Sequence, residues 1–520
     1  PKYCIDDNFS NNKQIMYFKK ISALPLFVSV VVIGVKECVG AKSRSSSLVA
    51  PDLISPSSGG KKSSARPTFA TSTTKVTSTK DINKIYHSRH HAVSVRGGGR
   101  DDDDGKASML SSVFNLVNNV AGAGILTLSV GMAPGTGYVP AMAICAFLGA
   151  MSCHSFAIIG DACELMGEKD FKGLWKRTIS PGSTYIVDAA IAIMCLACSI
   201  IYSGILGDVF TPLLEQVGLP AQFNGRTSNI LVITGLFLLP LSLIKDLSAL
   251  AFTSILGFLS IAYTVFFIVV RALDGSYSVP DGKFLQDGLI PILPTFEKTS
   301  LWNMDFTSLV LASNLGLAYI AHYNAPAFYR SLKNTNSKRF GVMVGISFTI
   351  LVLLYIATMV AGYSTFGDVC QGNILLNYHP SDFLSTLGRL ATGFSILFGF
   401  PLVASGARES IIGVASSLGN NAVGSDKNHF LLVAGILAFV TAIACTVKDV
   451  SLVVGITGAA LGSFIVYMIP PVIYSNAVSL SKGSNSPEAK SAKVNLLLVP
   501  FGLCIAFLGC YITIKESMQK

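Results

Sequence analysis

Residues 118–129 read NNVAGAGILTLS and lie near the middle of the first long apolar stretch of the chain, 108–132. Two adjacent asparagines open the segment, and polar side chains are costly in lipid unless they face a cavity or a partner. Gly122 and Gly124 weaken a helix at the same place, because glycine leaves the backbone free to adopt other conformations. We therefore expect a membrane-spanning helix that is interrupted near its centre.

Such an interruption has two explanations. An opened turn exposes backbone carbonyls and amides, which are tolerated at membrane depth where they line a cavity or bind a ligand. Alternatively, the glycines form a small-residue face that packs closely on another helix. The adjacent asparagines favour the first explanation, because polar groups inside a membrane mark ligand and ion pathways.

The composition of the chain is that of a membrane protein. Of its 520 residues, 51% are hydrophobic and only 13% are charged, against roughly 25% charged in a typical soluble domain. Apolar segments long enough to cross a bilayer recur along 107–520 and lack the alternation of barrel strands. We predict an all-α polytopic membrane protein with eleven transmembrane helices, at 108–132, 138–163, 185–210, 229–244, 249–272, 304–329, 341–365, 381–405, 430–447, 450–475 and 494–514.

The loops between these spans predict the orientation of the chain. Basic residues concentrate in the loops after spans 2, 6 and 10, and such loops face the cytoplasm. They are Lys169, Lys172, Lys176, Arg177, Arg330, Lys333, Lys338, Arg339, Lys482, Lys490 and Lys493. The first span is therefore expected to begin on the cytoplasmic side and the last to end on the opposite side.

The N-terminal region, 1–106, differs in composition from the rest. We expect it to be a disordered basic tail, rich in Ser, Thr, Lys and Arg, that cannot bury a core. Residues 16–41 have the shape of a signal peptide, with lysines before a short apolar run. The acid-poor segment 42–100 resembles an organelle transit peptide, and the two together resemble the two-part plastid address of some algae. A plain disordered tail is the alternative.

The sequence offers no sign of an enzyme or of a metal site. Nucleotide-binding, zinc-protease and serine-hydrolase signatures are absent, and the seven histidines do not cluster at metal-ligand spacing in the apolar part. Cys195 and Cys198 form a C-x-x-C inside an apolar span, where packing is their expected role. The net charge of +10 is attributed to the tail and the cytoplasmic loops and not to nucleic-acid binding.

Span 6 carries a second set of polar and small residues, namely Asn314, Gly316, His322, Asn324 and Pro326. Proline removes a helix hydrogen bond and disfavours helical conformation in the residue before it. Interrupted spans at corresponding places in two halves are the best sequence indication of a transporter site. Because spans 1 and 6 each open a set of five, the spacing fits an inverted 5+5 repeat whose broken helices meet near the midplane.

Five segments together resemble the amino acid/auxin permease family, and most closely its sodium-coupled neutral amino acid transporter branch. They are SVFNLVNNVAGAGIL (112–126), HYNAPAFYRSLK (322–333), AGYSTFGD (361–368), GRLATGFSILFGFPLVASGARESI (388–411) and VVGITGAALGSFIVYMIPP (453–471). The resemblance implies a leucine-transporter-like fold with discontinuous helices 1 and 6 and the transport of amino acids with an ion. It places substrate binding on Val120, Ala121, Gly122, Ala123, Gly124, Ala318, Tyr319, Ala321 and His322, and ion binding on Asn118.

The coupling ion, Na⁺ or H⁺, stays open. Sodium-coupled relatives tend to carry a threonine just before the proline that matches Pro401, where this chain has Leu397 and Gly399. Thr392 and Ser395 are the hydroxyls that can substitute. Coupling to protons needs a titratable group, and His322 is the candidate in spans 1, 6 and 8. Two further polar residues of span 8, Arg389 and Arg408, are expected to mark its ends.

The predicted function is secondary active transport of small neutral amino acids by alternating access, coupled to sodium or protons, without a cofactor. The alternative is an amino acid sensor of the same fold that signals through its N-terminal tail. The expected partners are the amino acid and membrane lipid, and the protein is expected to be a monomer. Its expected location is the plasma membrane or a vacuolar or other endomembrane, with a plastid membrane as a further candidate.

Overall fold

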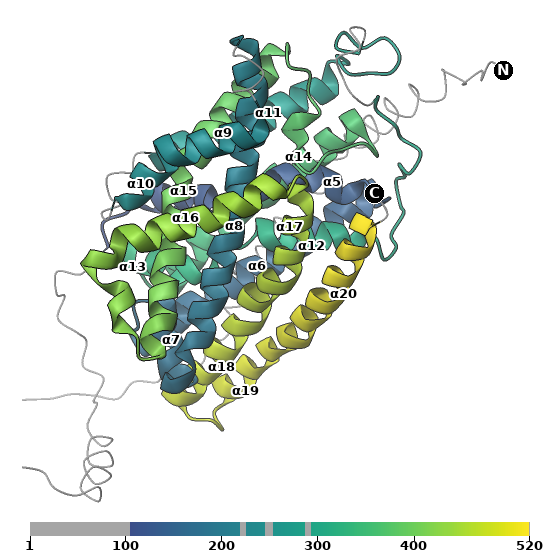
Figure 1. The fold of residues 1–520 in the computed structure, drawn as a ribbon. Helices are drawn as coiled ribbons and strands as arrows, with labels where there is room; N and C mark the ends of the chain where they lie inside the picture. The colour runs from purple at the N-terminus through teal and green to yellow at the C-terminus, as the bar shows by residue number, and fades with distance from the viewer. Residues whose placement is uncertain (1–104, 219–224, 245–252, 286–292, 519–520) are drawn as a thin grey trace, which may run out of the picture. The chain divides into compact units, whose positions relative to one another are not determined.

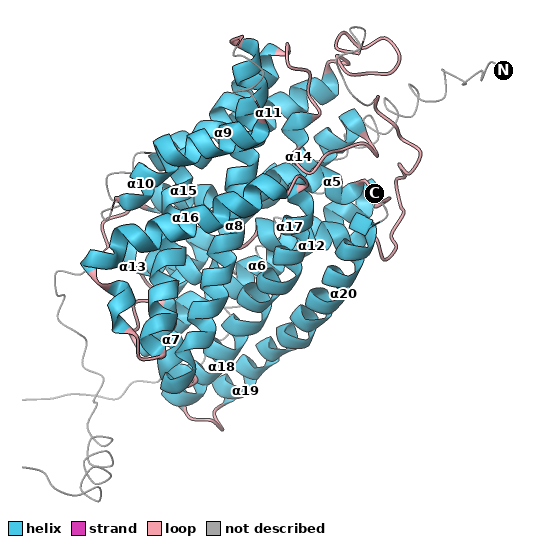
Figure 2. Cartoon of the chain, in the orientation of Figure 1, coloured by secondary structure: helices cyan, strands magenta, loops and turns pink. Residues whose placement is uncertain are grey.

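Helices form all the regular structure described for this chain. A computed structural model describes residues 105–218, 225–244, 253–285 and 293–518, and every regular element within them is a helix (Figure 2). The predicted tail lies outside the described residues up to residue 104, and so does its segment 16–41.

The first half of the membrane domain contains the first five predicted spans in order (Figure 1). Their helices are α4 (Met109–Val120), η1 (Ala123–Thr127) and α5 (Leu128–Met132); α6 (Tyr138–Met166); α8 (Thr184–Gln216); α9 (Arg226–Ile233), η4 (Thr234–Leu238) and α10 (Leu239–Leu243); and α11 (Thr253–Leu273). Two short helices connect α6 to α8, namely α7 (Phe171–Thr178) and η2 (Pro181–Ser183).

The second half follows the remaining predictions. Its helices are α12 (Ser308–Ala318), η6 (His322–Asn324) and α13 (Ala325–Ser331); α14 (Ser337–Phe366); α15 (Phe383–Ser417); α16 (His429–Thr446); α17 (Val450–Thr457), η10 (Gly458–Met468) and α18 (Ile469–Lys482); and α20 (Leu498–Met518). The connecting helices are η7 (Ile374–Leu376), η8 (Asn421–Gly424), η9 (Asp426–Asn428), α19 (Pro487–Lys493) and η11 (Val494–Leu497).

The number of membrane-crossing helices is close to the prediction but does not reach it. In the described part of the chain, nine helices are long and apolar enough to cross a membrane. The bent pair Met109–Val120 and Ala123–Met132 makes a tenth if it is one span. The remaining predicted span, span 6 at 304–329, is divided into α12 and α13, which are each short. A helical membrane protein is thus confirmed, whereas the number eleven and the inverted repeat stay predictions.

Hydrogen bonds between chain segments define two sides of the helical domain. At one side, the Ala107 N–H donates to the Ser331 carbonyl at 3.0 Å, which joins the start of α4 to the end of α13. At the other, the Gly137 N–H donates to the Asn303 carbonyl at 2.8 Å, which joins the start of α6 to the segment before α12. We call the first the inner side and the second the outer side. The inner side is the one predicted to face the cytoplasm.

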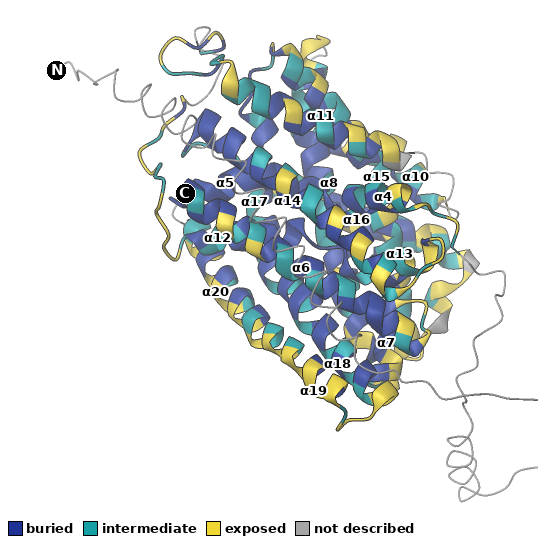
Figure 3. Ribbon diagram, turned by 180° about the vertical axis from the view of Figure 1, so that it is seen from behind, coloured by how far each residue is buried: buried dark blue, intermediate teal, exposed yellow. Residues whose placement is uncertain are grey.

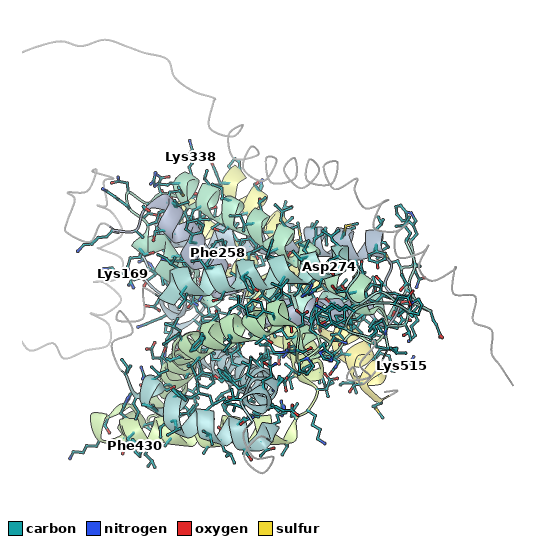
Figure 4. The ribbon with its side chains drawn as sticks, turned by 90° about the horizontal axis from the view of Figure 1, so that it is seen from above. Lys169, Phe258, Asp274, Lys338, Phe430 and Lys515 are labelled. Carbon is teal, nitrogen blue, oxygen red and sulfur yellow. The ribbon has the colours of Figure 1, made fainter. Side chains whose placement is uncertain are left out.

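Charged side chains gather toward these two sides. Figure 4 shows Lys169 and Lys338 at one end of the helices, whereas Asp274 and Lys515 lie at the opposite end. Lys169 and Lys338 belong to the basic loops from which the orientation was predicted. The distribution of these labelled residues is therefore the one expected of helices that cross a bilayer.

The core lies along the centre of the helical domain. Figure 3 shows buried residues along α6, α8 and α17 and exposed residues on α11, α16 and α19. Exposed apolar side chains at the periphery of the helical domain include Leu259 and Phe266 of α11 and Phe507 of α20. Exposed apolar side chains suit a helix whose outer face contacts lipid in place of water.

Candidate functional site

The first helix is broken where the sequence predicted an interruption. The α-helix α4 ends at Val120, and the axis turns by 49° before the chain continues through η1 into α5. Gly122 at the turn has φ −82° and ψ −149°, outside the helical range. Among the described residues, the N–H groups of Ala123 and Gly124 have no hydrogen-bond partner. They are the first N–H groups of η1 and carry the positive end of its dipole.

The second break lies in the span predicted to be its counterpart. The helix α12 ends at Ala318, and its last turn is closed by a bond from the Ile320 N–H to the Leu317 carbonyl at 3.1 Å. The chain becomes helical again at η6, and Pro326 stands in the first turn of α13, where its missing N–H costs nothing. Both breaks thus occur where glycine, asparagine and proline interrupt the apolar pattern.

The two breaks lie against each other. A Cβ added to Gly124 would lie 2.9 Å from the Ala318 Cα, so only glycine allows this approach. The Asn314 side chain donates to the Thr127 carbonyl at 3.1 Å and so joins α12 to η1. The Tyr355 hydroxyl of α14 donates to the Ala318 carbonyl at 2.6 Å and also lies 3.3 Å from the Val120 carbonyl. One side chain therefore contacts the last carbonyl of each interrupted helix.

A cavity of about 330 Å³ opens beside the breaks. Its walls are Asn115, Asn118, Asn119, Val120, Ala121, Gly122, Ala123, Gly124, Ile125, Leu126, Met194, Cys198, Ile201, Tyr202, Ile261, Thr264, Leu317, Ile320, Tyr323, Phe328, Thr392, Ser395, Ile396, Gly399, Leu402 and Val403. The wall residues nearest the inner side are Asn115 of α4 and Phe328 of α13. On α15, the wall residue nearest the outer side is Thr392, and no residue beyond it lines the cavity. The cavity therefore extends from the breaks toward the inner side.

Most of the predicted site residues meet at this cavity. Its walls contain the predicted ion-site residues Asn118, Thr392 and Ser395 and the whole predicted substrate segment 120–124. The other predicted substrate residues, Ala318, Tyr319, Ala321 and His322, are buried next to it and are not among its walls. At the second break the walls are made instead by Leu317, Ile320 and Tyr323.

The His322 side chain points away from the cavity. Its Nε2 lies 2.9 Å from the Ser155 hydroxyl and 3.0 Å from the Ser152 carbonyl, both on α6. Its ring also packs edge-on against Phe156, with 5.3 Å between the ring centroids. This environment is that of a residue that fixes the second break to α6.

Two helices besides the broken pair supply oxygen atoms to the cavity. The Thr392 hydroxyl of α15 lies 3.0 Å from the Thr264 hydroxyl of α11, and both residues are cavity walls. The Asn118 amide packs directly on Gly257 of α11, where a Cβ would collide with it. Gly257, Ile261 and Thr264 recur at helical spacing on one face of α11. Thr264 was not among the predicted site residues, although a threonine at helical spacing from Gly257 in an apolar span is a signal that could have indicated it.

Tyr202 of α8 is the wall of the cavity that lies against Gly122 of the first break. A Cβ added to Gly122 would lie 2.6 Å from the Tyr202 hydroxyl. The small residues predicted to receive a compact ligand therefore also allow Tyr202 to approach the broken backbone. Its hydroxyl lies where it can reach a ligand at the break.

The prediction that Arg389 and Arg408 mark the two ends of span 8 stays a prediction. Both lie inside α15, which runs from Phe383 to Ser417, and they are only 2% and 9% exposed. The helix α15 therefore extends beyond both arginines.

Known proteins resemble this chain over the part that holds the breaks and the cavity. The family model described as "Transmembrane amino acid transporter protein" matches residues 105–515. "Vacuolar amino acid transporter 5" of Schizosaccharomyces pombe is 27% identical over 411 residues, which are 76% of this chain and 90% of that protein. "Putative sodium-coupled neutral amino acid transporter 11" of Danio rerio is 26% identical over 373 residues, 71% of this chain and 79% of that protein.

Among solved structures, MhsT in complex with L-phenylalanine superimposes with a TM-score of 0.48 at 14% identity, and the match covers 79% of this chain and 100% of that one. This similarity is too weak to assign the fold. The family match, by contrast, covers most of the chain and includes all five segments on which the resemblance was based. The chain therefore belongs to the transmembrane amino acid transporter family, the amino acid/auxin permeases, as its sequence predicted.

Proposed function

We propose that this amino acid transporter works by secondary active transport of small neutral amino acids, coupled to a cation and driven by alternating access. The observation that supports this most strongly is the cavity of about 330 Å³ beside two adjoining helix breaks. Half-helix ends that meet in a cavity supply dipoles and free backbone groups for a zwitterion and a cation. The family consists of transporters and not of enzymes.

The substrate carboxylate is proposed to bind the free N–H groups of Ala123 and Gly124. These groups stand at the amino end of η1, where the helix dipole favours a negative charge. The Tyr202 hydroxyl lies close enough to Gly122 to add a further donor. The cavity volume is near the lower end of the roughly 300–1,000 Å³ typical of small-molecule pockets, which favours a compact substrate.

The coupling ion is proposed to be Na⁺, for which the cavity walls offer the oxygen atoms of Asn118, Thr392 and Ser395, with Thr264 beside Thr392. Hard oxygen atoms suit such a cation, and backbone carbonyls freed at the first break add to them. The name of the Danio rerio relative includes sodium coupling. Coupling to H⁺ is the alternative, for which His322 is the titratable candidate.

The helix order supports an eleven-span topology with a 5+5 inverted repeat as part of the same proposal. The broken helix α4–α5 opens the first set of five spans, and α12–α13 opens the second. Since the cavity extends to the inner side, the described conformation corresponds to the inward-facing state of an alternating-access cycle. The protein is proposed to act as a monomer in the plasma membrane, a vacuolar membrane or another endomembrane.

The direct experiment is uptake by the purified full-length chain in proteoliposomes. A panel of labelled amino acids is offered under a Na⁺ gradient and, separately, under a H⁺ gradient. We expect uptake of small neutral amino acids that depends on one of the two gradients. Binding without flux would favour the sensor alternative, and dependence on the H⁺ gradient alone would replace the sodium assignment.

A further inference from the structure

Arg389 is a buried cation on the outer side of the cavity. Its side chain belongs to α15 and the residue is 2% exposed. The Nη2 group donates to the carbonyls of Leu375 at 3.0 Å and Tyr378 at 2.6 Å, whereas Nε and Nη1 have no partner in the described part of the chain. Because Nε carries one hydrogen and Nη1 carries two, three of its five N–H bonds are unused.

The nearest carboxylate on the same helix does not neutralise this charge. Asp382, at the amino end of α15, accepts from Arg271 at both oxygens, at 2.8 and 2.6 Å. The Tyr277 hydroxyl also donates to Asp382, at 3.0 Å. Arg271 also pairs with Asp274, so one guanidinium serves two carboxylates, and neither carboxylate contacts Arg389. A buried charge without a counter-ion in contact is costly, and within a membrane such a residue indicates a functional site.

The position of Arg389 continues one wall of the cavity. Residues 389, 392, 396 and 399 are spaced so that they share one face of α15, and the last three are cavity walls. Arg389 thus stands one helical turn outward from Thr392. Immediately beside it, Phe210 of α8 packs on Gly393, where a Cβ would lie 2.9 Å from the ring. The outer end of the cavity is therefore closed at the level of Arg389.

The segment whose carbonyls accept from Arg389 also covers the closed outer end of the cavity. The carbonyl acceptors of Leu375 and Tyr378 belong to η7 and the residues just after it, between α14 and α15. This short helix contacts η1 of the first break, α8 and α15. Opening of the outer side requires η7 to leave these contacts, and its departure frees the two N–H bonds that it now occupies.

We propose that Arg389 forms an outer subsite for the α-carboxylate of the amino acid. In the outward-facing state the guanidinium binds the carboxylate of an arriving substrate, one turn before the ion-site residue Thr392. The substrate then moves inward to the N–H groups at the first break. The carbonyls of η7 replace the carboxylate on Arg389 as the outer side closes. This inference rests on the proposed transport function, to which it adds a step.

The test measures how strongly the outer side of the reconstituted full-length protein binds two compounds, one with the α-carboxylate charge and one without it. The probes are the amino acid that the wild type takes up fastest and its α-carboxamide as a competitor. In Arg389→Gln we expect KM for the amino acid to rise about tenfold or more, because a charge-assisted hydrogen bond to the carboxylate is lost. The inhibition constant of the carboxamide should stay unchanged, and Arg389→Lys should give a smaller rise in KM.

The matched control is Arg408→Gln, which removes a buried arginine from the inner half of the same helix. It should leave KM at the outer side unchanged. If Arg389→Gln left KM for the amino acid unchanged, or changed both probes by the same factor, the subsite would be refuted and Arg389 would only anchor η7. Absence of any uptake by the wild type would instead overturn the proposed function.

A second measurement uses the wild-type chain and does not depend on a variant that folds. Phenylglyoxal modifies free guanidinium groups, and mass spectrometry locates the adducts. In the absence of substrate we expect an adduct at Arg389, which the amino acid suppresses and its carboxamide does not. No adduct at Arg389, or equal protection by both compounds, would contradict the proposal.

Discussion

The Tyr355 hydroxyl donates to the Ala318 carbonyl across 2.6 Å, at the point where α12 stops. The same oxygen lies 3.3 Å from the Val120 carbonyl, the last of α4. A carbonyl at a helix end has lost its partner within the helix and needs another when it is buried. Through one buried side chain, α14 is therefore connected to both interrupted helices, and the three are expected to move together.

The first prediction concerns this connection. Tyr355→Phe removes the donor to the buried Ala318 carbonyl, whereas the Val120 carbonyl keeps the Gly122 N–H at 2.8 Å. The free energy of unfolding should fall by about 1–3 kcal/mol. Maximal transport rate should fall more than substrate affinity, because no cavity wall is removed. Thermal unfolding in detergent and initial uptake rates in proteoliposomes measure the two effects.

Tyr467→Phe is the control for Tyr355→Phe. Tyr467 is equally buried, and its hydroxyl lies 3.3 Å from Ser152 in a contact between η10 and α6. Loss of the Tyr467 hydroxyl should lower the free energy of unfolding without a selective fall in the maximal transport rate. A Tyr355→Phe protein with the same maximal rate as Tyr467→Phe would show that the contact to the breaks has no part in transport.

The second prediction tests the close approach of the two breaks. In Gly124→Ala the new methyl group would lie 2.9 Å from the Ala318 Cα, so the breaks must separate. We expect a destabilisation of about 1–3 kcal/mol and a loss of most of the uptake. Gly435→Ala is the matched control, because nothing lies within 4 Å of its Cβ position in α16. That variant should be as active as the wild type and up to about 1 kcal/mol more stable.

The third prediction tests the ion site. Asn118→Ala removes an oxygen from the cavity wall, and Gly257→Ala displaces the same amide from the side of α11. Both should raise the Na⁺ concentration needed for half-maximal uptake. Thr392→Val should do so as well, whereas Thr392→Ser keeps the hydroxyl and should not. Unchanged ion dependence in Asn118→Ala, with uptake also unchanged, would remove Asn118 from the site.

The fourth prediction uses a cysteine on the cavity wall. Cys198 lines the cavity, whereas Cys145 is fully buried between helices. A membrane-permeant maleimide should therefore block uptake by the wild type but not by Cys198→Ala, and substrate should slow the block. Equal inhibition of both proteins would place the reactive thiol elsewhere.

The helical architecture and the first break followed from the sequence because their causes are local. Apolar length set the spans, and the glycines with the adjacent asparagines set the interruption near Val120. Membership of the family was also readable, since five segments kept their order and spacing. The residues of the first break line the cavity although Val120, Ala121 and Ala123 are at most 5% exposed, because their small side chains bring the backbone itself to the cavity wall.

The walls at the second break were harder to predict. In the irregular stretch from Tyr319 to Ala321 no helical period tells which side chain faces inward, and the structure places Ile320 and Tyr323 on the cavity in place of His322. Tyr355 and Thr264 lie far along the chain from the residues they contact, so only the packing of whole helices brings them to the site.

Accumulation of a labelled small neutral amino acid in proteoliposomes under an imposed Na⁺ gradient is the most direct test of the account. We predict that the internal concentration rises above the external one and falls back to it when an ionophore dissipates the gradient. At the same external Na⁺ concentration, Asn118→Ala should accumulate the amino acid to a lower level than the wild type. A wild-type protein that binds amino acids but never concentrates them under a Na⁺ or a H⁺ gradient would contradict coupled transport through this cavity.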